Sequence, residues 1–293
     1  MLKAITPKVW AFDVEWVPDP VSGRLVYNLG PEVPDEEVLE VMYQNDPART
    51  DDNPRPYLKT VLCRVVSIAV VTREAPEGGK IDLKLRSWPA PEEQDQGEGA
   101  LIQRFLHGIG KSKPQLVGFN SIQADLVILT QRGVVNGLHL PGFGQRPDKP
   151  WFGPDYFGKG SNWNVDLRDA LSNWGKASTS LHEVASSCGI PGKIDCDGSN
   201  VMELWREGNV RKIVQYNECD AITTYLLWLR TAQFCGLLTP EQYGKEERQM
   251  EEMLGERACL VGQEHLATYL EKWREMRKIV RTLRKSSVVS ETR

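Results

Sequence analysis

Five short runs of apolar residues along the chain have the length and composition of β-strands. They cover residues 9–16, 61–72, 81–88, 115–120 and 162–167. The first run, V-W-A-F-D-V-E-W, is rich in β-branched and aromatic residues, which favour a pleated and packed surface. A turn signal at 77–80 joins the second run to the third and predicts a hairpin.

Longer segments have the apolar spacing of helices. They cover residues 99–109, 122–132, 167–174, 180–188, 209–230, 240–255 and 263–284. Residues 17–60 are Pro-rich and irregular apart from an acidic helical stretch at 34–42, and we expect them to form a surface insertion. This order of elements predicts one α/β domain over 1–235 with a mixed sheet. Residues 236–293 would form a helical extension packed on the same domain.

Four carboxylates and a phenol lie where apolar residues are expected. Asp13 and Glu15 interrupt the first strand, and alternate strand residues point to the same face. Asp125 follows a buried strand at the start of a helix. Tyr216 and Asp220 are four positions apart on the 209–230 helix and therefore share one of its faces.

Each signal alone has an ordinary explanation. Asp13 and Glu15 could be the solvated face of an edge strand, and Asp125 could favour a helix N-terminus through the dipole. Tyr216 and Asp220 could be a surface pair. Taken together, however, the five residues form a pattern that is hard to obtain by accident.

The pattern resembles the DEDD superfamily of 3′–5′ exonucleases, in the subclass with a tyrosine in the third motif. The motifs are F-D-V-E at 12–15, N-S-I-Q-A-D at 120–125 and Y-N-E-C-D at 216–220. The resemblance extends to predicted bacterial exonucleases related to the proofreading domain of family B DNA polymerases, over most of 8–235. The sequence departs from it at Ala124, where Phe or Tyr is usual, and at Asn217, where Cys is frequent.

The resemblance implies a ribonuclease-H-like fold, a mixed five-stranded sheet flanked by helices, and phosphodiester hydrolysis with two divalent cations, Mg²⁺ or Mn²⁺. Carboxylate oxygens suit these hard cations. Asp13 would bridge both ions, Glu15 and Asp220 would hold the ion that activates water, and Asp125 would support the second. Tyr216 would orient the attacking water.

Substrate contacts are expected from residues beside the motifs. Trp16 is a candidate for stacking on a terminal base, although a regular strand would turn it away from Glu15. Phe119 and Asn120 are placed to contact the 3′-terminal nucleotide, and Ser121 follows them. For Trp16 and Phe119, packing in the core is an equal or better explanation. Lys193 is a candidate phosphate contact or a plain solvated lysine.

The charge distribution limits how a polyanion is attracted. The net charge is −4, and residues 272–293 contain eight Lys/Arg and two Glu, a local +6 that leaves −10 on residues 1–271. An acidic body does not attract nucleic acid through its overall field, so bound cations and local basic groups must do so. The start of the chain lacks the apolar core of a signal peptide, and its apolar runs are too short to span a membrane, so we expect a cytoplasmic protein without a membrane partner.

These observations favour a metal-dependent 3′–5′ exonuclease on single-stranded ends, with DNA preferred over RNA as substrate. It would act alone in repair or recombination, or with a DNA polymerase as partner. One alternative is an RNA-trimming enzyme with the same chemistry. Another is a catalytically silent nucleic-acid-binding module, which the intact acidic residues disfavour. A third is an assembly protein whose C-terminal helices recruit a partner.

Overall fold

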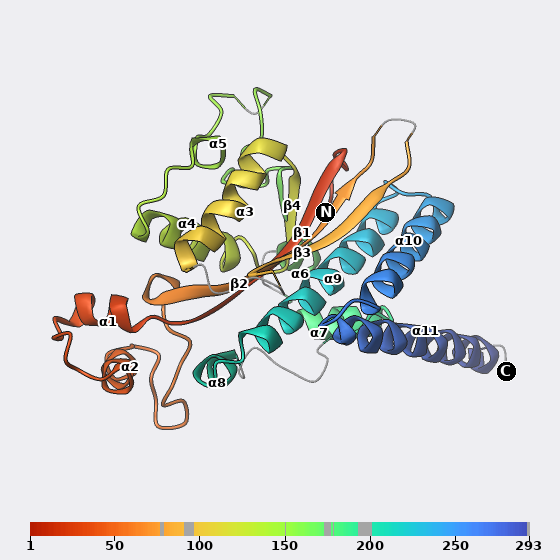
Figure 1. The fold of residues 1–293 in the computed structure, drawn as a ribbon. Helices are drawn as coiled ribbons and strands as arrows, with labels where there is room; N and C mark the ends of the chain where they lie inside the picture. The colour runs from red at the N-terminus through yellow and green to blue at the C-terminus, as the bar shows by residue number, and fades with distance from the viewer. Residues whose placement is uncertain are drawn as a thin grey trace.

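The computed structural model describes residues 1–76, 79–90, 97–149, 151–172, 177, 179–192 and 201–291. At its centre is a five-stranded sheet with the order β3-β2-β1-β4-β5 (Figure 1). The strands are β1 (Lys8–Pro18), β2 (Cys63–Glu74), β3 (Asp82–Trp88), β4 (Gln115–Gly118) and β5 (Asn164–Asp166). β2 runs antiparallel to β1 and β3, whereas β1, β4 and β5 are parallel. The prediction of a mixed, ribonuclease-H-like sheet is confirmed.

The helices also follow the predicted order, with additions. They are α1 (Pro20–Tyr27), α2 (Asp35–Gln44), α3 (Glu98–Ser112), α4 (Asp125–Val135), α5 (Pro141–Gly144), α6 (Leu167–Ser172), α7 (Leu181–Ser187), α8 (Val201–Arg206), α9 (Val210–Phe234), α10 (Pro240–Ala258) and α11 (Glu264–Glu291), with a 3₁₀ turn η1 (Thr60–Leu62). The sequence analysis missed α1, α5 and α8. Residues 173–174 of one expected helix and 77–78 of the hairpin turn lie outside the described residues.

Side chains of β1 alternate between two hydrophobic cores. Val9 and Ala11 pack on one face of the sheet, in a core shared with α9, α10 and α11. Trp10, Phe12 and Val14 pack on the other face with α2, α3 and α4. Because strand side chains alternate, Asp13 and Glu15 continue the face that packs against α9.

The C-terminal helices pack directly on the sheet domain (Figure 1). Met250 and Trp273 are fully buried in the core shared with α9. On the same face of the sheet, Glu246 of α10 forms a buried ion pair with Arg73 of β2 at 2.7 Å and accepts a hydrogen bond from the Tyr225 hydroxyl at 2.9 Å. Breaking a buried pair of this kind leaves an uncompensated charge, so the pair fixes α10 against β2.

The 17–60 insertion is more ordered than its Pro-rich sequence suggests. Asp19 accepts a hydrogen bond from the Val21 N–H and caps α1, and Pro20 stands at the start of that helix, where its missing N–H does no harm. In α2, Val38 and Met42 are fully buried. The insertion therefore has a packed face and is not a loop lying on the surface.

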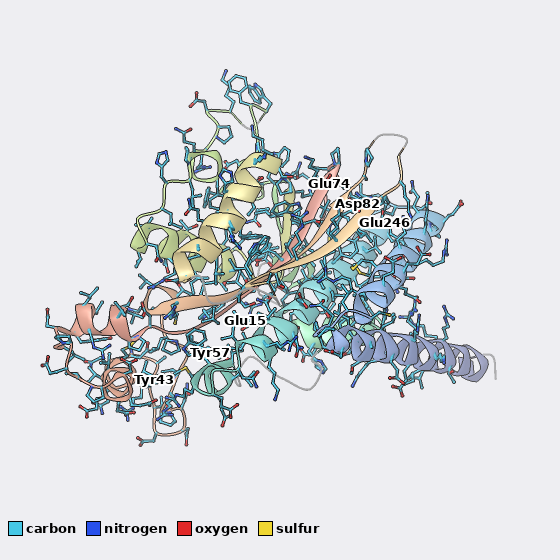
Figure 2. The ribbon with its side chains drawn as sticks, viewed as in Figure 1. Glu15, Tyr43, Tyr57, Glu74, Asp82 and Glu246 are labelled. Carbon is cyan, nitrogen blue, oxygen red and sulfur yellow. The ribbon has the colours of Figure 1, made fainter. Side chains whose placement is uncertain are left out.

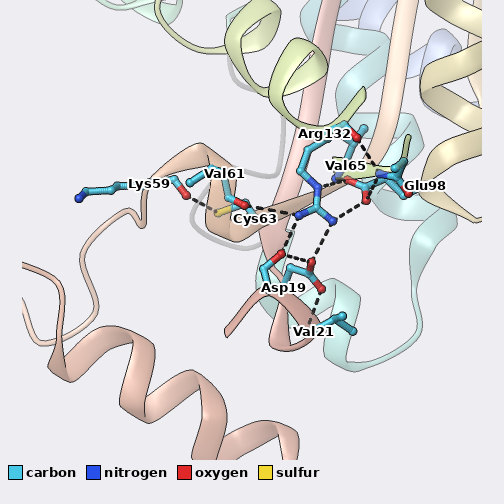
Figure 3. A network of polar contacts seen from close by, with 10 residues as sticks. Asp19, Val21, Lys59, Val61, Cys63, Val65, Glu98 and Arg132 are labelled. Carbon is cyan, nitrogen blue, oxygen red and sulfur yellow. Dashed lines mark hydrogen bonds and ion pairs between the residues drawn. The ribbon is translucent and has the colours of Figure 1, made fainter. Parts of the chain in front are cut away.

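A buried ionic network ties the insertion to the domain (Figure 3). The Arg132 guanidinium of α4 lies 2.9 Å from the Asp19 carboxylate and 2.6 Å from that of Glu98, and all three side chains are nearly inaccessible to solvent. Arg132 also donates to the Ser22 hydroxyl at 2.8 Å. The planar guanidinium suits several acceptors at once. The network thus joins the end of β1 to the first turns of α1 and α3.

None of the helices among the described residues combines the length and the apolar character that a membrane span requires.

Candidate active site

Three carboxylates meet at the end of the sheet face that packs on α9. Asp13 and Glu15 come from β1 and Asp220 comes from α9, and one ligand oxygen from each lies within 4.8 Å of the others. Each side chain is half-buried. The period of the strand places the first two together, and the packing of α9 across β1 brings in the third.

A β-bulge in the pairing of β1 with β2 follows directly after Glu15. The pairing register between β1 and β2 shifts between Glu15 and Trp16, because Val66 of β2 has no partner on β1. Bulges of this kind redirect side chains and occur next to active sites. Trp16 nevertheless stays on the face of Trp10, Phe12 and Val14, where it packs against their core, and it also lines the cleft.

Asp125 approaches from the edge of β1 that β4 leaves open. β4 pairs with β1 only from Val9 to Ala11, so the later N–H groups on that edge have no strand beside them. Asp125, at the first position of α4, accepts a hydrogen bond from the Val14 N–H at 3.0 Å. The second motif is thereby fixed to the first.

The turn before Asp125 is held in a particular backbone conformation. Asn120 has a left-handed φ of 65°, uncommon for a residue other than glycine. The buried carboxylate of Asp166 accepts hydrogen bonds from the N–H groups of Asn120 at 2.9 Å and Ile122 at 3.0 Å. It also accepts from the Arg168 N–H at 2.9 Å, which caps α6. Asp166 therefore shapes the turn that presents Asp125.

A close approach of the backbone supports the same turn. A Cβ atom on Gly118 would lie 2.4 Å from the Ser121 Cβ, so only glycine fits at the end of β4. Ser121 is fully buried against this glycine and does not line the cleft. The expected contact between Ser121 and a substrate stays a prediction, and it would require this buried side chain to become accessible from the cleft.

Tyr216 lies one helical turn before Asp220 on α9, and its hydroxyl is hydrogen-bonded to the Asp220 carboxylate. Burial is the main cause of the raised pKa of Tyr216, and the charges of Asp220, Glu15 and Asp13 add to it. The phenol is therefore protonated at neutral pH. It is able to donate a hydrogen bond but unable to act as a base.

The carboxylates of the site are crowded together and partly shielded from solvent, and both effects raise their pKa values. Burial, followed by the charges of Asp125, Glu15 and Asp220, raises the pKa of Asp13 well above its usual range. Burial and the charges of Asp220 and Asp125 do the same to Glu15. Burial raises the pKa of Asp125 to about 7, although its bond from the Val14 N–H opposes the shift. In the absence of a cation, the site holds protons that isolated carboxylates would release.

The donor set fits hard divalent cations. It consists of carboxylate oxygens from Asp13, Glu15 and Asp220, close enough to share an ion, with Asp125 beside them. Mg²⁺ and Mn²⁺ prefer such ligands, and a cation would remove the mutual repulsion that raises these pKa values.

The carboxylates form the floor of a cleft of about 920 Å³. Asp13, Glu15, Asp125 and Asp220 all line it. The further lining residues come from the ends of the strands, the insertion and α8: Val14, Trp16, Pro18, Tyr43, Arg55, Pro56, Tyr57, Leu58, Cys63, Phe119, Asn120, Ala124, Met202, Glu203, Arg206 and Glu207. The insertion and α8 therefore build a wall that sequence motifs alone did not indicate.

The expected substrate contacts divide into three groups. Trp16, Phe119 and Asn120 line the cleft, the two aromatic side chains being partly buried against the hydrophobic cores. Ser121 does not line it, and Lys193 lies outside the described residues. The sequence analysis missed Arg55, Tyr57 and Arg206, because they belong to segments that carry no motif and no clear periodicity.

Comparisons with known proteins bear on the same region. Residues 55–273 match the model of a family described as "Predicted 3'-5' exonuclease related to the exonuclease domain of PolB". The match contains Asp125, Tyr216 and Asp220, whereas Asp13 and Glu15 precede it. No curated protein matched the sequence.

Among solved structures, the family B DNA polymerase from the hyperthermophilic archaeon Pyrobaculum calidifontis is similar, with 18% identity and a TM-score of 0.44. The similarity covers 95% of this chain and 29% of the polymerase chain, so this chain spans less than a third of that protein's length.

Proposed function

Because the chain belongs to the family of predicted 3′–5′ exonucleases related to the exonuclease domain of PolB, we propose that it removes nucleotides from the 3′ ends of single-stranded DNA in a metal-dependent reaction. The observation that carries the proposal is the meeting of Asp13, Glu15 and Asp220 within 4.8 Å at the floor of a large cleft, with Asp125 fixed beside them.

The acids would hold the cations. In this proposal Asp13 would contribute to holding both ions, Glu15 and Asp220 would hold one of them, and Asp125 would support the other. Two divalent cations would supply Lewis-acid stabilisation of the attacking and leaving oxygens at the scissile phosphate. Asp13 and Glu15 are absent from the family match, so their assignment rests on their geometry beside Asp220.

Tyr216 would position the nucleophile. Its hydroxyl is hydrogen-bonded to Asp220 and stays protonated, so the phenol oxygen is left to accept a hydrogen bond from a water molecule. This role orients water without removing its proton. Proton removal would then fall to a carboxylate of the site.

Asn120 and Phe119 would contact the terminal nucleotide. Both line the cleft beside Asp125, and the Asn120 side chain accepts a hydrogen bond from Arg168 at 2.6 Å, which fixes its orientation. Side chains that are held before binding lose little freedom when a ligand arrives. The acidic floor suits a phosphodiester only when cations are bound, consistent with metal dependence.

The test is a gel assay on single-stranded DNA with a free or a blocked 3′ end, in Mg²⁺ or Mn²⁺, with a matched RNA in parallel. We expect stepwise shortening of DNA with a free 3′ end only, lost in EDTA. Faster shortening of RNA would establish the exoribonuclease alternative. Binding of folded protein to both strands without any product would establish the silent binding module and reject the proposal.

A further inference from the structure

An exposed aromatic side chain stands on the wall that the insertion contributes to the cleft. Tyr57 is 84% exposed, although it lies between the buried Pro56 and Leu58. All three line the cleft. In the view of Figure 2, Tyr57 lies between Glu15 on the cleft floor and Tyr43 of α2. A single exposed aromatic residue is common on a protein surface, and Tyr57 stands out because its ring is presented on the wall of the cleft.

The backbone around Tyr57 is anchored on both sides. Leu58 belongs to the core formed with α2, α3 and α4. Prolines at 54 and 56 restrict their own backbone and that of the residue before each of them. Tyr57 is therefore presented from a restrained segment, and a rigid aromatic ring with few rotatable bonds loses little entropy on binding.

Arg55, two positions before Tyr57, provides a positive charge on the same wall of the cleft. Its guanidinium lies 5.8 Å from the centroid of the Tyr43 ring and 4.0 Å from the Glu40 carboxylate. The Arg55 side chain is 57% exposed and that of Glu40 is 43% exposed, so this ion pair is weak and easily exchanged for a phosphate.

Helix α8, which also lines the cleft, adds no net positive charge to it. Arg206 of α8 is paired with Glu36 at 3.0 Å, and α8 and the residue after it also bring Glu203 and Glu207 to the cleft. Among the described residues of the insertion that line the cleft, Arg55 is the only one with a positively charged side chain.

We propose that Tyr57 and Arg55 form a subsite for the nucleotides that precede the scissile bond. The Tyr57 ring stacks on an unpaired base, and the Arg55 guanidinium contacts a backbone phosphate. Aromatic faces bind all bases, so the subsite grips a strand without reading its sequence. In a duplex the base faces are already stacked on one another, so the subsite favours single strands. This inference rests on the proposed function, because it takes the acidic floor as the place of the scissile phosphate.

Stacking is tested by binding. A fluorescent oligothymidine with phosphorothioate linkages, which resists hydrolysis, is titrated with protein in Mg²⁺ and its anisotropy is followed. Base stacking is worth about 1–3 kcal/mol, so we expect Tyr57→Ala to weaken binding by about five- to a hundredfold. Tyr57→Phe keeps the ring and should stay within about twofold of wild type.

The control for Tyr57 is another exposed aromatic residue. Trp151 is 74% exposed and does not line the cleft, so Trp151→Ala should bind as wild type does. Unchanged affinity in Tyr57→Ala, or an equal loss in Trp151→Ala, overturns the stacking assignment.

The phosphate contact is tested by salt. Each phosphate contact to a single strand contributes about 0.7 to the slope of log K against log salt concentration. Arg55→Gln should reduce the slope by about that amount. Arg49 is the matched control, because it also lies near Glu40, at 3.8 Å, but does not line the cleft. An unchanged slope in Arg55→Gln, or an equal change in Arg49→Gln, removes Arg55 from the subsite.

A small substrate separates this inference from the proposed function. The p-nitrophenyl ester of thymidine 5′-monophosphate reaches only the cleft floor. Tyr57→Ala should hydrolyse it at the wild-type rate while binding the oligonucleotide weakly. If wild type hydrolyses neither the ester nor DNA, the proposed function fails, and the binding titration still decides whether Tyr57 contacts a single strand. If ester hydrolysis falls in Tyr57→Ala as much as binding does, the residue acts on the site itself and the subsite is rejected.

Discussion

The Asp125 carboxylate accepts a hydrogen bond from the Val14 N–H at 3.0 Å, across 111 positions of the chain. Val14 lies between Asp13 and Glu15, so this bond fixes the helix that carries one acid to the strand that carries two others. The carboxylate occupies the edge of β1 that β4 does not reach. A gap in the sheet thus becomes the point at which two distant motifs join.

Asp125→Asn tests how much the ionisation of Asp125 lowers the stability of the metal-free protein. The amide oxygen still accepts from Val14, but the charge is gone. Because the pKa of Asp125 is raised to about 7 from an unfolded value near 4, the folded state holds a proton that the unfolded state releases. Stability of the metal-free wild type therefore decreases as pH rises from about 4 to about 7 through this group.

Urea unfolding in EDTA at pH 5 and pH 8 measures that contribution. We expect the wild type to lose more stability between these pH values than Asp125→Asn does, and Mg²⁺ to reduce the difference by neutralising the site. An equal pH dependence in the two proteins without metal would show that Asp125 ionises normally in the folded state.

Tyr216→Phe separates orientation of water from proton removal. The attacking water would lose the hydroxyl that orients it, and misplacement of a reacting group can cost about 10²-fold, so we expect kcat to fall by about ten- to a hundredfold while the Mn²⁺ affinity is kept. Since the raised pKa keeps the phenol protonated, the alkaline side of the pH–rate profile should be the same in both proteins. An alkaline limb present in wild type and missing in Tyr216→Phe would mean that the hydroxyl titrates during turnover.

Asp166→Asn tests the turn that presents Asp125. The two carboxylate oxygens accept separately from Asn120 and Ile122, and an amide offers only one acceptor. One buried N–H loses its partner, so we expect a loss of about 1–3 kcal/mol in the free energy of unfolding and a fall in kcat that exceeds the change in KM. The neighbouring Asp169→Asn, outside the cleft, is the control, and equal effects of the two substitutions would argue against a role in the turn.

Arg132→Met tests the anchor of the insertion. It leaves the buried carboxylates of Asp19 and Glu98 without a counter-charge, a loss that we expect to reach about 3–5 kcal/mol by urea unfolding. Arg146→Met is the matched control. Its pair with Asp155 has a guanidinium side chain that is 57% exposed, so the loss there should stay near or below about 1 kcal/mol. Similar losses in the two variants would show that the buried network contributes no more than a surface pair.

The sequence predicted the central sheet and the acidic floor because both follow from local periods. A strand period of two places Asp13 beside Glu15, and a helical turn places Tyr216 beside Asp220. The convergence of these pairs with Asp125 was expected only through the resemblance, because it depends on how α4 and α9 pack on β1.

The wall of the cleft was not predictable in the same way. The Glu15/Trp16 bulge is a local irregularity in pairing with β2, and the position of α1 against the domain depends on the contact between Asp19 and Arg132, 113 positions apart. Tyr57 lies in a Pro-rich stretch without periodicity, and its exposure becomes meaningful only when Pro56 and Leu58 are seen to be buried. Such features depend on tertiary contacts that no short window of sequence contains.

The most direct test of the account is the rate at which the 3′-terminal nucleotide is released from single-stranded DNA as Mn²⁺ is titrated, in wild type and in Asp13→Asn. Asp13 is a member of the carboxylate group that would hold the cations. We predict a rate that saturates with Mn²⁺ in wild type and falls by at least about a hundredfold in Asp13→Asn, the scale on which removal of one preorganised electrostatic group lowers kcat. Equal rates in the two proteins, with both shown to be folded, would contradict the assignment of this cluster as the active site.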